Sequence, residues 1–201
     1  GEVAYHDGVF ERKGTGQTVS LFEVAARAEE MKKQGALAES LDTDSEADTG
    51  PSFPNGCHIA EVEVDPGTGE TQVVAYTAVG DVGIVLNERI VEGQVQGGVA
   101  SGIGQAIGEY TQYDNDSGQL VAASFMDYRM ARAADVPSMK VIHHVVPCRT
   151  NYVGAKGTGE AGTTAAPPVI VSAIENAISP KAFLNLQMPV TPQTIWQALQ
   201  G

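Results

Sequence analysis

The chain has 201 residues, of which 42% are hydrophobic and 18% charged, and 12 basic residues stand against 25 acidic ones, for a formal net charge of −13. This length and composition predict one ordinary hydrophobic core or two small ones, and they exclude a disulfide scaffold, a coiled coil and a low-complexity polymer. So acidic a surface repels nucleic-acid backbones and anionic lipid, and no stretch reaches the roughly 18 uninterrupted apolar residues of a membrane helix. We therefore expect neither nucleic-acid binding nor a membrane span.

The start of the chain predicts a small hairpin followed by a helix. Asp7-Gly8 is typical of a tight turn between two short strands within residues 2–12. Ser20 and Glu23 form a capping-box pattern, in which each side chain satisfies a free backbone donor of the other, and this predicts a helix to about Lys33.

A change in composition divides the chain. Residues 35–56 are rich in Ser, Asp, Glu and Pro and show no useful hydrophobic periodicity. This composition predicts an exposed acidic loop or a disordered crossing. We therefore expect a small hairpin–helix segment over residues 1–34 and a C-terminal domain over residues 57–201.

The C-terminal domain mixes strands and helices without strict alternation. Alternating apolar residues bounded by Pro and Gly predict a hairpin, and proline at a first helical turn predicts two late helices. The expected strands cover residues 58–64, 71–79, 120–125 and 140–146, and the expected helices cover residues 88–113, 167–178 and 192–199. The fold class is therefore α+β, with a mixed, largely antiparallel sheet and packed helices.

Glycine is unusually dense in the predicted helix between Glu92 and Glu109. Because each glycine inside a helix costs about 1 kcal/mol relative to alanine, this density needs a compensating close contact. Either another element packs against the bare backbone, or a bulky cofactor does so, with Gln94 or Gln96 supplying amide hydrogen bonds. The spacing by itself favours packing.

A second glycine-rich segment, Lys156-Gly-Thr-Gly-Glu-Ala-Gly162, formally matches a dinucleotide-binding pattern. That pattern requires a strand directly before it and a helix opening on its last glycine, whereas loop-like residues precede it and the next helix is expected at Pro167. What remains is Glu160, a carboxylate in a flexible loop. Beside Lys156 such a group is by default a solvated charge, and it serves as a general base only where desolvation favours its protonated form.

A third segment follows the expected strand over residues 120–125. A strand that runs into a loop is a common place for functional side chains. Structural roles are nevertheless favoured over functional ones for these residues: Phe125 and Met126 are expected in the core, and Asp127 is expected to pair with Arg129.

Histidine and cysteine provide no site of their own. His143 and His144 fall in an expected strand and point to opposite faces, so the two cannot chelate one ion, and zinc-ligand spacing is absent. Cys57 and Cys148 are too few for a disulfide framework and fit a reducing compartment, and Cys148 is expected to be a buried, inert thiol.

Taken together, these segments resemble a known family. In order and spacing they are similar to the C-terminal part of the molybdenum-binding large subunit of the xanthine dehydrogenase, aldehyde oxidase and carbon monoxide dehydrogenase family. The resemblance covers residues 57–200 well and residues 1–34 more loosely. It is carried by GQVQGGVASGIGQA from Gly93, GQLVAASFMDYR from Gly118 and KGTGEAG from Lys156.

The resemblance implies that the chain is part of a larger molybdopterin-binding subunit of a molybdenum hydroxylase. Such enzymes oxidise an aldehyde, an N-heterocycle or carbon monoxide with oxygen taken from water. The family's glutamate, which removes a proton from a water or hydroxyl ligand of molybdenum, corresponds to Glu160 in this sequence. Gln94 matches an amide contact to the pterin, and Gly157, Thr158 and Gly159 would bring backbone near the ligands of the metal.

The resemblance also implies missing partners, because large subunits of this family are several times longer than this chain. The partners are the N-terminal remainder of the large subunit, a flavin subunit with FAD and a 2Fe–2S subunit, and the cofactor is molybdenum–molybdopterin in its cytosine dinucleotide form. The chain by itself is expected to be inactive. It opens without Met or a secretory leader, which predicts a fragment or a processed subunit, with a cytoplasmic location favoured and a periplasmic one left open.

Two other functions compete with this hypothesis. The chain is alternatively a non-catalytic acidic α+β module whose glycine-rich helix is a subunit-docking face. A nucleotide-binding domain built on the Gly157 loop is the weakest hypothesis, because the flanking elements do not fit.

Overall fold

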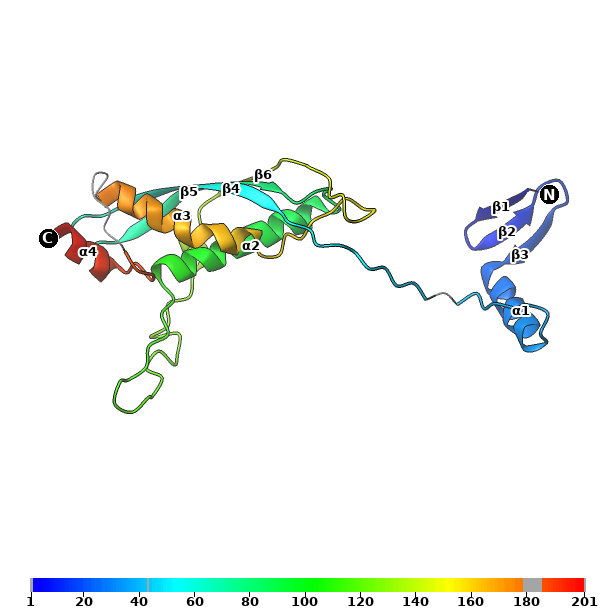
Figure 1. The fold of residues 1–201 in the computed structure, drawn as a ribbon, viewed down its shortest axis with the longest axis horizontal. Coiled ribbons are helices and arrows are strands. Elements are labelled where there is room, and N and C mark those ends of the chain that lie inside the picture. Colours follow the sequence, from blue (N-terminus) through cyan, green and yellow to red (C-terminus); the bar gives the residue numbers. More distant parts are fainter. Residues whose placement is uncertain (1, 43, 179–185, 201) are drawn as a thin grey trace. The chain divides into compact units, whose positions relative to one another are not determined.

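The computed structural model describes residues 2–42, 44–178 and 186–200. The chain divides into two compact units, Gly1–Asp48 and Thr49–Gly201. Figure 1 shows the elements of both units in sequence colours. No helix in the described part of the chain is long and apolar enough to cross a membrane.

The N-terminal unit is a three-stranded antiparallel sheet followed by one helix. The strands are β1 (Val3–His6), β2 (Val9–Arg12) and β3 (Gln17–Ser20), and the helix is α1 (Leu21–Lys33). The predicted hairpin is confirmed, with Asp7 and Gly8 both at positive φ in its turn, whereas β3 was not predicted. The capping box is also confirmed: Glu23 N–H donates to Ser20 Oγ at 3.2 Å, and Ser20 N–H donates to the Glu23 carboxylate at 2.9 Å.

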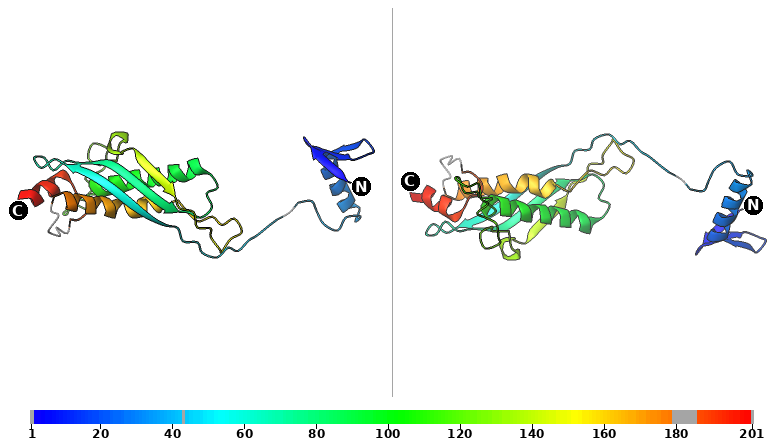
Figure 2. Two further views of the ribbon diagram at one scale, coloured as in Figure 1. Left: turned by 90° about the horizontal axis from the view of Figure 1, so that it is seen from above. Right: turned by 90° about the horizontal axis from the view of Figure 1, so that it is seen from below.

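The C-terminal unit contains a sheet in the order β4–β5–β6. β4 (Asn55–Val64) runs antiparallel to β5 (Thr71–Asp81), and β6 (Met139–His143) runs parallel to β5. Helices α2 (Glu88–Ile107) and α3 (Ala161–Ile178) lie side by side on one face of this sheet, as the two views in Figure 2 show. The short helix α4 (Pro192–Gln200) completes the unit. The predicted α+β class and the mixed, largely antiparallel sheet are thus confirmed.

Close packing of α2 against α3 explains part of the glycine density. A Cβ atom added to Gly98 would lie 2.8 Å from the backbone N of Thr163, and one added to Gly102 would lie 2.5 Å from the Cβ of Ala166. No side chain fits at such distances, so these glycines let the two helices approach closely. The core surrounding this contact comprises Val73, Tyr76, Ala78, Val95, Val99, Ile103, Ala106, Ile107, Ala166, Ile170, Ile174, Val190 and Ile195.

The predicted boundaries of two helices were wrong. α3 begins at Ala161 rather than at Pro167, so Pro167 and Pro168 lie inside the helix, where each removes a backbone hydrogen bond. Pro167 is buried against α2, and this tertiary contact outweighs the local preference for proline in a first turn. α2 ends at Ile107 rather than near Tyr113.

The segment after α2 differs most from expectation. Instead of a strand over residues 120–125 it is a long loop, which extends away from the sheet and helices in Figure 1 and contains a single bridge between Tyr113 and Leu120. Phe125 and Met126 are not core residues but are 79% and 93% exposed. Because this segment does not pair with a strand of the described sheet, its apolar side chains are not buried against one.

The expected pair of Asp127 and Arg129 does not form either. Arg129 instead lies 3.6 Å from Asp135, and Asp127 accepts a hydrogen bond from Ser124 Oγ at 3.1 Å. The conformation of the loop after α2, in place of the expected strand, therefore brings Arg129 close to Asp135.

Candidate functional site

One cleft in the C-terminal unit has a volume of about 530 Å³. It lies where the three strands meet the glycine loop and the N-terminal halves of α2 and α3. Its lining includes His58, Gly80, His143, Val91, Val95, Gly157, Gly159 and Glu160. The fold therefore brings the predicted glycine loop and Glu160 together with residues that are distant in the sequence.

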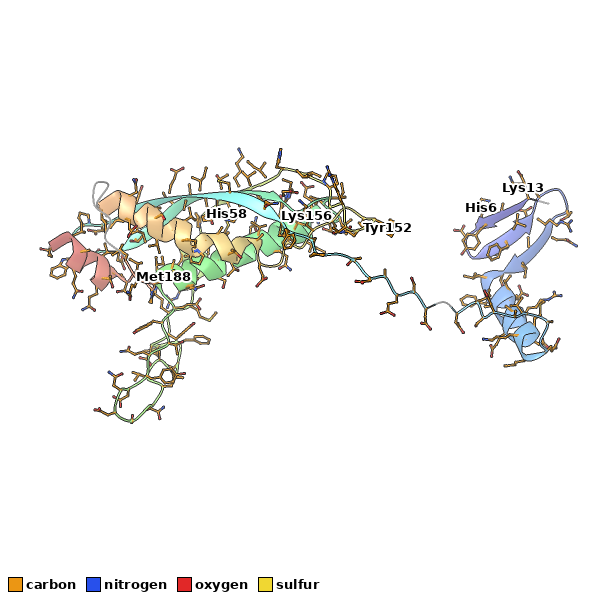
Figure 3. All side chains as sticks on the ribbon, viewed as in Figure 1. His6, Lys13, His58, Tyr152, Lys156 and Met188 are labelled. Carbon is orange, nitrogen blue, oxygen red and sulfur yellow. The ribbon has the colours of Figure 1, made fainter. Side chains whose placement is uncertain are left out.

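A buried ion pair anchors the start of the glycine loop to the sheet, and Figure 3 labels its lysine, Lys156. Lys156 Nζ lies 2.5 Å from Asp81 Oδ2, and the two side chains are only 9% and 10% exposed. The backbone N–H groups of Gly83 and Val146 donate to Asp81 Oδ1 at 3.0 and 3.1 Å. These hydrogen bonds, that of Lys156 first, lower the pKa of Asp81 from 3.8 to about 2. The pair is therefore ionised at neutral pH and holds the loop at the end of β5.

Backbone contacts reinforce this anchor. The N–H of Lys156 donates to the carbonyl of Val82 at 2.8 Å, and the N–H of Ile84 donates to the carbonyl of Gly154 at 2.9 Å. Gly83 and Gly154 both have positive φ, and a Cβ on Gly83 would collide with the carbonyl of Gly154. Glycine is therefore required where these two segments cross.

Glu160 lies at the junction of the glycine loop and α3. Its carbonyl accepts hydrogen bonds from the N–H of Thr164 at 3.0 Å and from the Thr164 hydroxyl at 2.9 Å, which fixes its backbone. The residue is exposed, lines the cleft, and its carboxylate makes no hydrogen bond or ion pair within the described part of the chain. A carboxylate held in this way is available to an incoming group.

The loop residues before Glu160 leave space and one unmet hydrogen bond. Among the described residues, no neighbouring atom lies within 4 Å of a Cβ added to Gly157 or Gly159. Between them, Thr158 is half-buried, and its hydroxyl is buried without a partner among the described residues. Buried hydroxyls are almost always hydrogen-bonded to protein or to ordered water, so this one has the capacity for a further hydrogen bond.

Gln94 lies on a different surface from the cleft lining. It is exposed on α2, next to Gly93 and close to Gly97, and no neighbour in the part of the chain that the structure describes lies within 4 Å of a Cβ added to either glycine. This side of α2 therefore presents bare backbone and an amide to the outside. The packing alternative for the glycine-rich helix thus holds for Gly98, whereas packing within the described residues does not explain Gly93 and Gly97.

Of the two elements that must flank the dinucleotide-binding glycine pattern, a strand before it and a helix after it, only the helix is present in the described residues. α3 does open directly at the last glycine, contrary to the sequence-based expectation, but residues 149–156 form a loop with one isolated bridge instead of a strand. A strand entering the first glycine is still missing.

Sequence reasoning missed the position of His58 in the cleft wall and its hydrogen bond to a buried residue behind that wall, Tyr76. His58 Nδ1 lies 2.8 Å from the hydroxyl of Tyr76, which is 2% exposed, and burial lowers the pKa of His58. The alternation of side chains along β4 could have predicted the inward position of His58. His58 lies on the same face of the strand as Ala60 and Val62, whereas Ile59, on the other face, is 57% exposed.

Cys148 is not the buried, inert thiol that was expected. It is half-buried, and its Sγ lies 3.1 Å from the Thr150 hydroxyl. That hydrogen bond lowers the pKa of the thiol.

Comparison with known proteins places the chain in a family. Residues 1–137 match the model of a molybdopterin cofactor-binding domain, a match that ends before the glycine loop. The large subunit of nicotine 6-hydroxylase from Paenarthrobacter nicotinovorans is 38% identical over 151 residues, which is 75% of this chain and 18% of that protein. Subunit gamma of the 6-hydroxypseudooxynicotine dehydrogenase complex from the same organism is 34% identical over 200 residues, covering 96% of this chain and 25% of that protein.

Solved structures agree. Quinoline 2-oxidoreductase from Pseudomonas putida 86 superimposes with a TM-score of 0.74 at 32% identity, over 98% of this chain and 26% of that chain. The Cu,Mo-CO dehydrogenase superimposes with a TM-score of 0.77 at 26% identity, over 98% of this chain and 25% of that chain. The chain thus spans about a quarter or less of the length of its relatives. It belongs to the molybdopterin cofactor-binding domain family, as part of the large, molybdenum-binding subunit found in the xanthine dehydrogenase, aldehyde oxidase and carbon monoxide dehydrogenase group.

Proposed function

We propose that the protein containing this chain is a molybdenum hydroxylase that oxidises an aldehyde, an N-heterocycle or carbon monoxide with oxygen from water, and that Glu160 is its general base. The observation that carries the proposal is the Glu160 carboxylate in the cleft, which has no partner among residues 2–42, 44–178 and 186–200, is held by its backbone and is flanked by Gly159 and Ala161. An N-heterocycle is the favoured substrate class, because nicotine and quinoline appear in the names of two relatives.

The residues of this chain fit the edge of a large cofactor. The open glycines Gly157 and Gly159 allow close approach to backbone, and the unpartnered Thr158 hydroxyl supplies a hydrogen bond. Gln94 would supply an amide contact from the open side of α2. When bound, molybdenum–molybdopterin, which we propose to be the cytosine dinucleotide form, supplies the activation of water and the redox chemistry.

The role of Glu160 is to hold and move a proton. A general base must reach the group that it deprotonates at about 2.6–3.2 Å, and the small neighbours of Glu160 place no side chain in the way. Accepting a proton on a carboxylate oxygen requires that no other cation holds this carboxylate, and Lys156 is already paired with Asp81. The Asp81–Lys156 pair therefore positions the loop and at the same time keeps the lysine away from Glu160.

The remaining parts of the active site lie outside this chain in our proposal. They are the rest of the large subunit, a flavin subunit with FAD and a 2Fe–2S subunit, in a cytoplasmic enzyme. Two observations support this: the chain spans a quarter or less of its relatives, and one relative is named as a subunit of a dehydrogenase complex. The isolated chain should accordingly be inactive.

The test is Glu160→Gln in the complete enzyme. Loss of the base should lower kcat by about 10²- to 10⁴-fold while the molybdenum content stays normal. Glu61→Gln, at an exposed position of β4, is the matched control and should retain full activity. Full activity in Glu160→Gln would rule out the assigned role. If the wild type contains no cofactor and Glu160→Gln changes no measured property, the result would instead favour the non-catalytic docking module.

A further inference from the structure

We infer that Glu88, Glu92 and His143 form a binding site for one divalent transition-metal ion at the N-terminal end of α2. One carboxylate oxygen of each glutamate and one ring nitrogen of His143 all lie within 4.8 Å of one another. Imidazole nitrogen and carboxylate oxygen are the donors with which proteins bind Zn²⁺ and related ions, whereas Ca²⁺ and Mg²⁺ prefer oxygen alone.

Rigid elements bring these donors together. Glu88 and Glu92 are four residues apart and therefore share one face of the first turns of α2. The start of this helix is fixed by Asn87, whose side-chain oxygen accepts the N–H of Ile90 at 3.1 Å. His143 is the last residue of β6 and is held opposite Gly80 of β5 in the parallel ladder. α2 contacts β6, so the two glutamates and the histidine meet without the help of a mobile loop.

The cluster has bonding capacity that the described part of the chain leaves unused. Nε2 of His143 is buried and has no hydrogen-bond partner there. Neither Glu88 nor Glu92 forms an ion pair among the described residues, although their carboxylates lie close to each other in a chain of net charge −13. A divalent cation would cancel the two negative charges and take up an imidazole lone pair, so one ligand satisfies both needs.

The geometry lies close to that of a coordinated ion. Donors about 2.0–2.2 Å from a tetrahedral Zn²⁺ are about 3.4 Å apart, so the donors, now within 4.8 Å of one another, need to close by at most about 1.4 Å. Glu88 is exposed and free to rotate, while Glu92 and His143 are half-buried and already constrained. Three protein donors leave a fourth position for water. The bound ion would tie the first turns of α2 to the end of β6, beside the cleft that His143 lines.

The experiment is a titration of the purified protein, freed of weakly held metals with EDTA, with ZnCl₂ and separately with CoCl₂. We expect one Zn²⁺ per chain bound through this cluster by calorimetry, a higher thermal midpoint with the ion, and visible absorption bands from Co²⁺ in a nitrogen- and oxygen-ligated site. His143→Gln and Glu92→Gln should each weaken this binding by about 10- to 100-fold or more and abolish the Co²⁺ bands. His144→Gln, at the exposed neighbouring position, and Glu61→Gln should bind like the wild type.

Absence of binding, or equal binding by the wild type and by both His143→Gln and Glu92→Gln, would overturn the inference. Far-UV circular dichroism checks that each variant is folded, and if His143→Gln is not, Glu92→Gln and Glu88→Gln decide the question. No step of this inference depends on the role of Glu160, so an inactive or cofactor-free preparation still tests it.

Discussion

The two sides of α2 use the same residue type for opposite purposes. On the side towards α3, Gly98 and Gly102 leave no room for even one carbon atom. On the other side, a Cβ added to Gly93 or Gly97 would have no described neighbour within 4 Å, and Gln94 is exposed beside them. The comparison teaches that packing against α3 accounts for only part of the glycine density of this helix, and that the packed side is the one that contributes to the stability of this unit.

The largest expected effect breaks the packed side. Gly98→Leu places a side chain against the backbone of Thr163, so α2 and α3 must separate, and the free energy of unfolding should fall by about 3 kcal/mol or more. Gly97→Leu, one residue away on the open side, should leave it unchanged or raise it by up to about 1 kcal/mol, because leucine favours the helix. Urea denaturation of the purified proteins measures both.

Measuring the molybdenum cofactor content of Gly98→Leu and Gly97→Leu distinguishes the two sides of α2 further. If the open side receives the pterin, Gly97→Leu should be folded but depleted in molybdenum cofactor. Equal destabilisation by the two substitutions would contradict the distinction between the two sides. Loss of subunit assembly with normal cofactor content would instead identify the open side as a docking face.

An intermediate effect is expected at the anchor of the glycine loop. The pKa of Asp81 is lowered from 3.8 to about 2, so its carboxylate stabilises the fold above about pH 4, and this contribution is lost as the pH falls from about 4 to about 2. Asp81→Asn should lower the thermal midpoint at pH 7, because Lys156 loses its buried partner, and should flatten the decline of the midpoint below pH 4. Asp116→Asn, at an exposed turn position, is the control. Parallel acid curves for the wild type and Asp81→Asn would contradict the assignment.

The smallest effect is expected in the loop after α2. Phe125→Ser should change the free energy of unfolding by less than about 0.5 kcal/mol, because Phe125 is 79% exposed. Ile170→Ala, at a fully buried position of α3, should lower it by about 2–5 kcal/mol. Chemical denaturation compares the two, and a large loss in Phe125→Ser would show that the loop packs more closely than its exposure indicates.

Sequence reasoning succeeded where a few neighbouring residues settle the outcome. The turn at Asp7-Gly8, the capping box of Ser20 and Glu23, and the β4–β5 hairpin each depend on contacts within or between adjacent elements. The glycine loop was recognised as a candidate site, although the roles of Glu160 and Gln94 stay predictions. The same reasoning failed at Pro167 and at Phe125, because packing against α2 in one case and the absence of a sheet neighbour in the other are not visible in a local pattern.

Local order and the family of this protein follow from short-range chemistry: turns, caps, alternation and the glycine motifs can all be recognised in the linear chain. Long-range packing alone determined which glycines of α2 face α3, how Asp81 reaches Lys156 across 75 residues, and how His143 meets two glutamates of a distant helix. The physical reason is that backbone preferences act over a few bonds, whereas burial and ion pairing act between surfaces that meet only after the sheet and helices have assembled.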